Sequence, residues 1–243
     1  MKQLTGACII GQSGGPTAVI NASAQGVIQT ALKADCITHV LGAAHGIKGV
    51  LEDKLYDMGQ EDSVELDLLK FTPSSALGSC RYKLADPDVD DADYRRILEI
   101  FKKYDVRYFF YNGGNDSMDT CNKISKYMQK VGYECRIMGV PKTIDNDLNG
   151  TDHCPGFGSV ARYMAGTVRE LGVDVRSLPI HVVVLEALGR TAPENDFEAM
   201  QQLEAATAHT APASLAALRQ KPERFNTVID PAQIAEVALG YQE

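Results

Sequence analysis

The sequence predicts an α/β fold: a Rossmann-like, three-layer α/β/α lobe followed by a partial second α/β lobe. Two observations indicate this fold. Short apolar runs alternate with segments of helical period, which is typical of a parallel sheet covered by helices on both faces. Polar, glycine-rich turns follow several of these runs, at the position where open α/β sheets bind ligands. The length of 243 residues accommodates two lobes, which we place at 1–150 and 151–243.

The first elements are a strand, a glycine turn and a helix. Residues 7–10 form a short apolar run that predicts a buried strand, and the stretch 11–16 is rich in glycine. A helix is predicted over 17–34, and a second strand over 37–43. The segment 46–70 mixes glycine, acidic and apolar residues without one clear period, so its structure stays open.

A second series of elements begins with a helix over 88–104. Its apolar residues have the spacing i, i+3, i+4 and i+7, and aspartates stand near its start, where the helix dipole favours acids. Strands are predicted over 106–111 and 135–140, with a turn at 112–117 and a helix over 118–131 between them. The pattern then predicts a helix over 157–171 and a strand over 180–188, followed by an alanine-rich tail with short helices at 194–208 and 231–238.

Composition excludes several classes of protein. A formal charge of −8 argues against a broad electrostatic grip on nucleic acid or on an anionic membrane, so any phosphate site must be local. No run of 18 apolar residues occurs, and residues 1–11 lack the apolar core of a signal peptide. The six cysteines form no CxxC pair and no zinc-ligand pattern, which favours buried thiols in a reducing compartment. We therefore expect a cytoplasmic protein.

Two glycine turns could approach a phosphate closely. The first includes Gly14 and Gly15 and stands between the first strand and its helix, where free backbone N–H groups point at an anion. A tight turn without a ligand explains such a pair equally well. The second, residues 112–117, adds oxygen-bearing side chains that suit a hard cation such as Mg²⁺. Helix capping by Asp116 or Ser117 would explain one of those side chains but not the whole cluster.

A third turn combines groups that suit phosphoryl transfer. Residues 141–147 place two carboxylates, Asp145 and Asp147, beside Lys142 and Thr143, directly after a predicted strand. Such a set can supply a base, a metal or hydroxyl orienter and a cation for a phosphoryl group. An Asx-rich surface turn is the structural alternative, although it gives no reason for the lysine and threonine. In a fourth turn, after the strand at 180–188, Arg190 could bind a sugar phosphate.

Five motifs together resemble the 6-phosphofructokinase family, most closely its pyrophosphate-dependent branch. They are GGPTAVIN (14–21), TPSSALGSCRYKL (72–84), NGGNDSMDT (112–120), PKTIDND (141–147) and GFGSVARY (156–163). The resemblance runs in the same order over about residues 5 to 190, and PKTIDND with GGNDS is far more specific than a glycine pair. It implies phosphoryl transfer from pyrophosphate to the 1-hydroxyl of fructose 6-phosphate, with a donor-binding first lobe and a sugar-phosphate-binding second lobe.

The resemblance also assigns roles to residues. Asp145 matches the general base, Asp147 the second carboxylate, and Lys142 a cation toward the transferring group. The donor positions are Gly14, Gly15, Arg81, Gly114, Asp116 and Ser117. The substrate positions are Thr143, Ile144, Asp145, Leu188, Gly189 and Arg190, with Leu188 in place of the usual methionine.

Asp116 and Lys142 indicate which phosphoryl donor is used, and Asn115 and Asp116 indicate the metal site. Family members that use ATP resemble one another in having glycine where Asp116 stands, and an aspartate there would repel the α-phosphate of a nucleotide. Lys142 stands where ATP users often have a small residue. The metal would be Mg²⁺ at Asn115 and Asp116, with Asn115 in place of the family's common acidic ligand.

Two other functions remain open at this point. One is a non-catalytic relative, a binding or assembly subunit that keeps the anion site, because the later substrate-binding motifs of the family have no recognisable match after residue 190. The other is an ATP-dependent 6-phosphofructokinase. An incomplete second lobe would expose sheet edges and apolar surface, so we expect a homo-oligomer.

Overall fold

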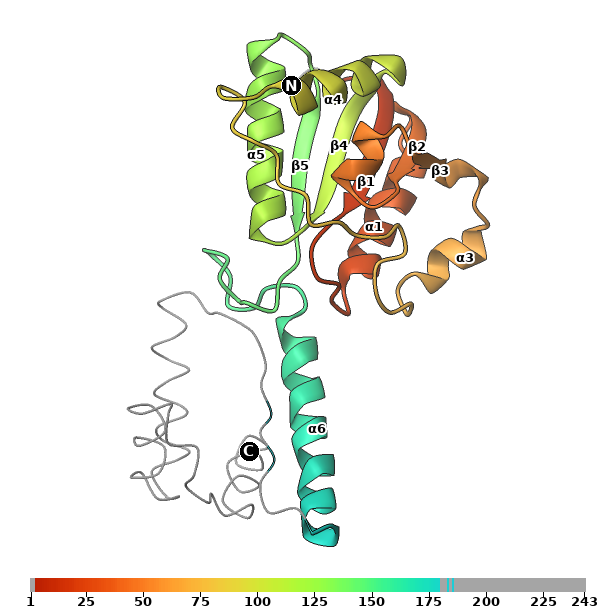
Figure 1. The fold of residues 1–243 in the computed structure, drawn as a ribbon. Coiled ribbons are helices and arrows are strands. Elements are labelled where there is room, and N and C mark those ends of the chain that lie inside the picture. Colours follow the sequence, from red (N-terminus) through yellow and green to blue (C-terminus); the bar gives the residue numbers. More distant parts are fainter. Residues whose placement is uncertain (1–2, 180–182, 184, 186–243) are drawn as a thin grey trace. The chain divides into compact units, whose positions relative to one another are not determined.

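The computed structural model describes residues 3–179, 183 and 185, and the chain divides into two compact units, Met1–Thr143 and Ile144–Glu243. The predicted helices at 194–208 and 231–238 lie outside the described residues, as does the predicted strand at 180–188 apart from residues 183 and 185. The first unit contains a five-stranded sheet in the order β3-β2-β1-β4-β5 (Figure 1). Its strands are β1 (Gly6–Gln12), β2 (Ile37–Ala43), β3 (Leu55–Asp57), β4 (Val106–Gly113) and β5 (Arg136–Pro141).

The strands pair as a doubly wound sheet. β1 pairs in parallel with both β2 and β4, and β5 pairs in parallel with β4, whereas the short β3 runs antiparallel to β2. The four predicted strands of this unit are therefore confirmed, each within two residues at either end. Because connections leave β1 in both directions along the sheet, the carboxyl ends of β1 and β4 form a topological switch point.

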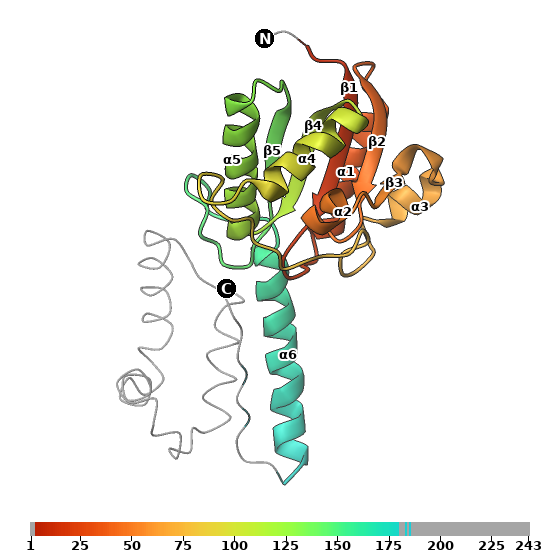
Figure 2. The ribbon, with the colours of Figure 1, turned by 45° about the horizontal axis from the view of Figure 1, so that its top comes forward.

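Helices cover both faces of this sheet, which confirms the three-layer arrangement. α1 (Ile20–Leu32) and α3 (Ser63–Leu68) pack on one face through a core that includes Cys8, Ile10 and Ile28. α2 (Ile47–Leu51), α4 (Ala92–Lys103) and α5 (Asn115–Lys130) pack on the other face, which Figure 2 presents with α2 and α4 in front. The larger core lies on this second face and contains Tyr94, Phe101 and Phe109 among its buried side chains.

Three helix starts differ from the prediction. α4 begins at Ala92 rather than at residue 88, because the Val89 and Asp90 N–H groups close a turn on the Asp86 carbonyl before the helix. α1 begins at Ile20 rather than at residue 17, because the left-handed backbone of Gly14 (φ 78°) and the loop after it delay the helix. α5 begins at Asn115 rather than at residue 118, with Gly114 as its N-cap. The segment left open contains α2, β3, a 3-10 turn η1 (Met58–Gln60) and α3.

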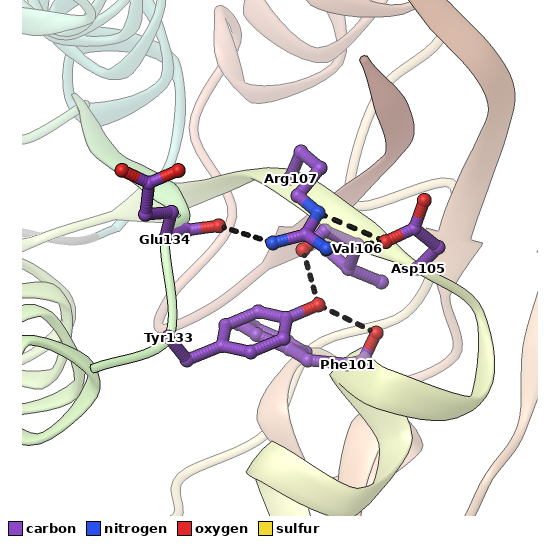
Figure 3. Close-up of polar contacts among 6 residues, drawn as sticks. All are labelled: Phe101, Asp105, Val106, Arg107, Tyr133 and Glu134. Carbon is purple, nitrogen blue, oxygen red and sulfur yellow. Dashed lines mark hydrogen bonds and ion pairs between the residues drawn. The ribbon is translucent and has the colours of Figure 1, made fainter. Parts of the chain in front are cut away.

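The amino-terminal end of β4 carries a compact polar cluster (Figure 3). The Tyr133 hydroxyl lies 2.9 Å from the carbonyl oxygens of both Phe101 and Val106, so it joins the end of α4 to the start of β4. Arg107 stacks over the Tyr133 ring at 4.8 Å, and it donates to the Asp105 carboxylate at 2.8 Å and to the Glu134 carbonyl at 3.0 Å. These side chains therefore hold the amino-terminal end of β4 in place, at the opposite end of the strand from the switch point.

In the second unit the structure describes a loop and one long helix, α6 (Phe157–Ser177). α6 confirms the predicted helix over 157–171 and extends it by about a turn and a half. Of the helices within the described residues, none combines the length and the apolar character that a bilayer crossing requires.

Candidate active site

The carboxyl ends of β1, β4 and β5 bring the starts of three predicted turns together. Gln12 and Asn112 are register partners at the ends of β1 and β4, and Gly113 pairs with Pro141 at the end of β5. The Ser13 N–H donates to the Asn112 carbonyl at 2.8 Å, which continues the sheet pairing into the glycine turn. The sheet therefore fixes where each of the three turns begins.

The loop that carries Arg81 is hydrogen-bonded to the glycine turn after β1. The Ser79 hydroxyl donates to the Gly14 carbonyl at 2.5 Å, and the Ser13 hydroxyl donates to the Cys80 carbonyl at 3.4 Å. A Cβ built at Gly15 would meet nothing within 4 Å, so the backbone there faces open space. Arg81 itself is exposed and follows directly after Cys80. This turn thus offers an exposed backbone in contact with the loop that carries Arg81, as an anion site requires.

Lys142 joins all three turns. Its side chain is only 5% exposed, and its ammonium group donates to the Gly15 carbonyl. Its backbone N–H donates to the Gly113 carbonyl at 3.0 Å. A Cβ built at Gly14 would lie 3.4 Å from the lysine Nζ. The positive charge predicted to face a phosphoryl group therefore lies within the glycine turn, and Thr143 beside it is also buried.

The second predicted turn is in fact the first turn of α5. Asn115 and Asp116 are exposed in this helical turn, whereas Ser117 is buried. Capping by Asp116 or Ser117 was the structural alternative, but the N-cap is Gly114 and no side chain bonds there as a cap. The start of α5 and the glycine turn after β1 follow strands that are neighbours in the sheet, so the amino-terminal end of the helix lies next to that turn. The carboxyl ends of β1 and β4 are therefore suited to an anion that is accompanied by a metal ion.

Beneath these turns lies Tyr111, a buried side chain that the sequence patterns did not single out. Its hydroxyl accepts a hydrogen bond from the Ile47 N–H at 3.2 Å, and a Cβ built at Gly46 would lie 2.9 Å from that oxygen. Burial raises the pKa of the Tyr111 phenol above its ordinary value, so it stays a neutral donor and acceptor. Tyr111 therefore supports the start of α2 and the glycine turn from below.

The second unit begins with the carboxylates of the PKTIDND motif. Asp145 and Asp147 are half-buried on either side of Asn146, which is buried and left-handed (φ 51°). The Asn146 amide donates to the Asp152 carbonyl at 3.0 Å, and its oxygen accepts from the Cys154 N–H at 2.8 Å. These bonds close the loop 146–154 and fix the backbone between the two carboxylates. Ile144 is half-buried at the start of this unit.

The remaining predicted substrate residues, Leu188, Gly189 and Arg190, lie outside the described residues. The roles predicted for all site residues stay predictions.

Comparison with known proteins agrees with the resemblance. The chain matches the protein family described as Phosphofructokinase over residues 7–206. It is 51% identical over 185 residues to the pyrophosphate--fructose 6-phosphate 1-phosphotransferase of Methylococcus capsulatus, covering 74% of this chain and 44% of that protein. It is 50% identical over 190 residues to the protein of the same name from Xanthomonas campestris pv. campestris, covering 77% of this chain and 45% of that protein.

A solved structure gives the same result for the fold. The crystal structure of the pyrophosphate-dependent phosphofructokinase from Nitrosospira multiformis superposes with a TM-score of 0.66 at 49% identity, covering 70% of this chain and 42% of that one. The chain thus spans less than half the length of each of these three relatives. With the matched residues, the doubly wound sheet and the three motif-bearing turns at its carboxyl edge, the chain belongs to the phosphofructokinase family.

Proposed function

We propose that this chain takes part in reversible phosphoryl transfer from pyrophosphate to the 1-hydroxyl of fructose 6-phosphate, which gives fructose 1,6-bisphosphate. The observation that carries this proposal is the buried Lys142, whose ammonium group is bonded to the Gly15 carbonyl among the glycine turns. A fixed cation beside the exposed backbone of Gly15 suits a small, highly charged anion. The names of the Methylococcus and Xanthomonas relatives support pyrophosphate as that anion.

The choice of pyrophosphate over ATP rests on Asp116. Its carboxylate is exposed in the first turn of α5, beside the glycine N-cap at Gly114. A nucleotide bound through its β- and γ-phosphates must also accommodate an α-phosphate, and a carboxylate at that place would repel it. Pyrophosphate has no third phosphate, so it avoids this repulsion.

The residues at the start of α5 fit a magnesium ion. Asn115 and Asp116 are exposed residues whose side chains carry an amide oxygen and carboxylate oxygens. Among the described residues, no group of three or more His, Cys, Asp or Glu side chains could hold a metal by itself. A magnesium ion that arrives with a phosphate ligand and keeps several waters needs only one or two protein oxygens. When bound, Mg²⁺ would offset negative charge on the phosphates.

The chain's own residues would then act by position and proton transfer. In this proposal Asp145 accepts the proton of the attacking 1-hydroxyl, and Asp147 supports the same region as a second carboxylate. Thr143 and Ile144 orient the sugar, together with the residues expected at 188–190. The bonds of Asn146 to Asp152 and Cys154 keep the backbone of the two carboxylates in place.

A coupled assay for fructose 1,6-bisphosphate tests this function with pyrophosphate and with ATP in parallel. We expect turnover with pyrophosphate, and a loss of at least about 100-fold in Asp145→Asn, the range of a missing general base. Asp152→Asn is the matched control, because it changes an exposed aspartate of the same loop. Equal rates with ATP would contradict the argument from Asp116.

Calorimetric titration with pyrophosphate separates the proposal from the non-catalytic alternative. Binding without turnover, unchanged in Asp145→Asn, would favour a binding or assembly subunit. Turnover that Asp145→Asn abolishes would exclude that alternative.

A further inference from the structure

Two buried amide side chains, Gln12 and Asn21, bind the loop that leads to Arg81. The Gln12 oxygen accepts from the Ser75 hydroxyl and from the Leu77 N–H, both at 2.9 Å. The Asn21 oxygen accepts from the Ala76 N–H at 2.8 Å. Both side chains are almost fully buried, with exposed fractions of 0% and 1%. The two residues thus hold a loop that is more than 50 residues away in sequence.

The same two amides are bonded to each other and to the start of α1. The Gln12 amide donates to the Asn21 oxygen at 3.0 Å and to the Ile20 carbonyl at 3.2 Å. The Asn21 amide donates to the Thr72 carbonyl at 2.9 Å. Every polar atom of this pair therefore has a partner, and the pair joins β1, α1 and the 72–77 segment. A buried amide that fails to find partners destabilises the fold, so this saturation constrains the loop to one position.

The loop transmits this constraint to the donor site. Beyond Leu77 the same loop supplies the Ser79 hydroxyl, which donates to the Gly14 carbonyl at 2.5 Å. It also supplies the Cys80 carbonyl, which accepts from the Ser13 hydroxyl. The next residue is the exposed Arg81. The position of this arginine relative to the glycine turn therefore depends on what holds the loop behind it.

We propose that Gln12 and Asn21 form an amide clamp, a positioning device that sets the Arg81 loop against the glycine turn for binding of the donor anion. This inference rests on the proposed function, since it assumes that pyrophosphate binds at these turns. Neither residue touches the donor in this proposal; each acts through the loop.

Gln12→Leu tests the clamp, since it keeps the buried volume and removes all four hydrogen bonds of the side chain. Ser75→Ala is the milder variant, because it removes one of the four bonds of Gln12, together with the bond of the same hydroxyl to the Gly78 carbonyl within the loop. Gln25→Leu is the matched control. Gln25 is also a buried glutamine, but it lies on α1 and its amide is bonded to Asp67 rather than to the 72–81 loop.

We expect Gln12→Leu to raise the KM for pyrophosphate about tenfold, with the KM for fructose 6-phosphate within about twofold, and Ser75→Ala to change it less in the same direction. The dissociation constant of pyrophosphate in calorimetry should rise by the same factor. Trypsin should cleave after Arg81 faster in Gln12→Leu than in the unaltered chain or in Gln25→Leu, as mass spectrometry of the fragments would report.

Two results for Gln12→Leu would overturn the clamp: equal changes in the KM values for pyrophosphate and fructose 6-phosphate, or tryptic cleavage after Arg81 at the same rate as in Gln25→Leu. Either result would mean that Gln12 contributes to packing alone. If the unaltered chain binds pyrophosphate but does not turn over, the proposed activity fails, while altered affinity and cleavage in Gln12→Leu still support the clamp. An unaltered chain that neither binds pyrophosphate nor turns over would overturn both proposals.

Discussion

Substitution of Gly113 by alanine should destabilise the first unit, because β4 ends against α5 without room for a methyl group. A Cβ built at Gly113 would lie 2.0 Å from the Ser117 Oγ, 2.5 Å from the Ser117 Cβ and 3.2 Å from the Ser13 carbonyl oxygen. Favourable contacts between such atoms need about 3.5 to 4 Å. Rotation of the Ser117 side chain would move its Oγ but not its Cβ, so the strand end must shift away from the helix.

Overpacking of this kind costs about 1 to 3 kcal/mol, which corresponds to a fall in Tm of about 3 to 10 °C for a chain of this size. Circular dichroism during heating measures it. Gly114→Ala is the matched control, because the nearest heavy atom to its Cβ would be the Lys142 carbonyl oxygen at 3.9 Å. We expect Gly114→Ala to keep its Tm and to weaken pyrophosphate binding, since backbone approach is what a glycine there offers an anion.

A second substitution locates the clash. Ser117→Gly removes both atoms nearest the new methyl group, so it should recover part of the stability that Gly113→Ala loses, beyond its own cost of about 1 kcal/mol for glycine in a helix. Ser117→Ala keeps the Cβ and should recover little. A Tm for Gly113→Ala within 1 °C of the unaltered chain, or equal recovery by both variants, would refute the packing argument.

Three further predictions concern the donor, the amino-terminal end of β4 and pH. Asp116→Gly should raise the ratio of ATP-driven to pyrophosphate-driven turnover at least about tenfold, since a like-charge contact is removed; an unchanged ratio in the coupled assay would contradict the repulsion argument. Tyr133→Phe should lower the free energy of unfolding by about 1 to 2 kcal/mol in urea titrations, because the two carbonyls that share its hydroxyl lose their donor. Burial raises the pKa of the Cys8 and Cys121 thiols and of the Tyr94 phenol to about 12. The unfolded chain releases these protons near the ordinary values of 9.0 and 10.0, so stability should be constant below about pH 8.5 and fall as the pH rises from 9 toward 12; a urea midpoint unchanged at pH 10.5 would disprove this.

Sequence periodicity predicted the parallel strands of the first unit because each contains a short apolar run, although only β1 is buried along its whole length and β5, at the edge of the sheet, is largely exposed. It could not predict α2, β3 or α3, since these elements are only three to six residues long and depend on neighbours. β3, for example, forms by antiparallel pairing with β2. The residues Asn115, Asp116 and Ser117 favour turns by composition, yet a glycine N-cap places them inside a helix.

The candidate site was predictable to the extent that its residues follow strands. Gly14, Gly15, Gly114 and Lys142 lie at the carboxyl edge of the sheet, as the order of motifs implied. The supporting residues could not be found in this way. Gln12 and its loop are linked only through hydrogen bonds across 63 to 65 residues, and no local pattern reports such a link.

The polar cluster around Tyr133 and Arg107 has a practical consequence for engineering. It occupies the end of β4 at which no predicted ligand-binding residue lies, and within the described part of the chain its hydrogen bonds join its own groups and nearby backbone. Substitutions that raise thermal tolerance can therefore be sought around this cluster with little risk to ligand affinity. Substitutions at the carboxyl end of β4 would alter thermal tolerance and ligand affinity together.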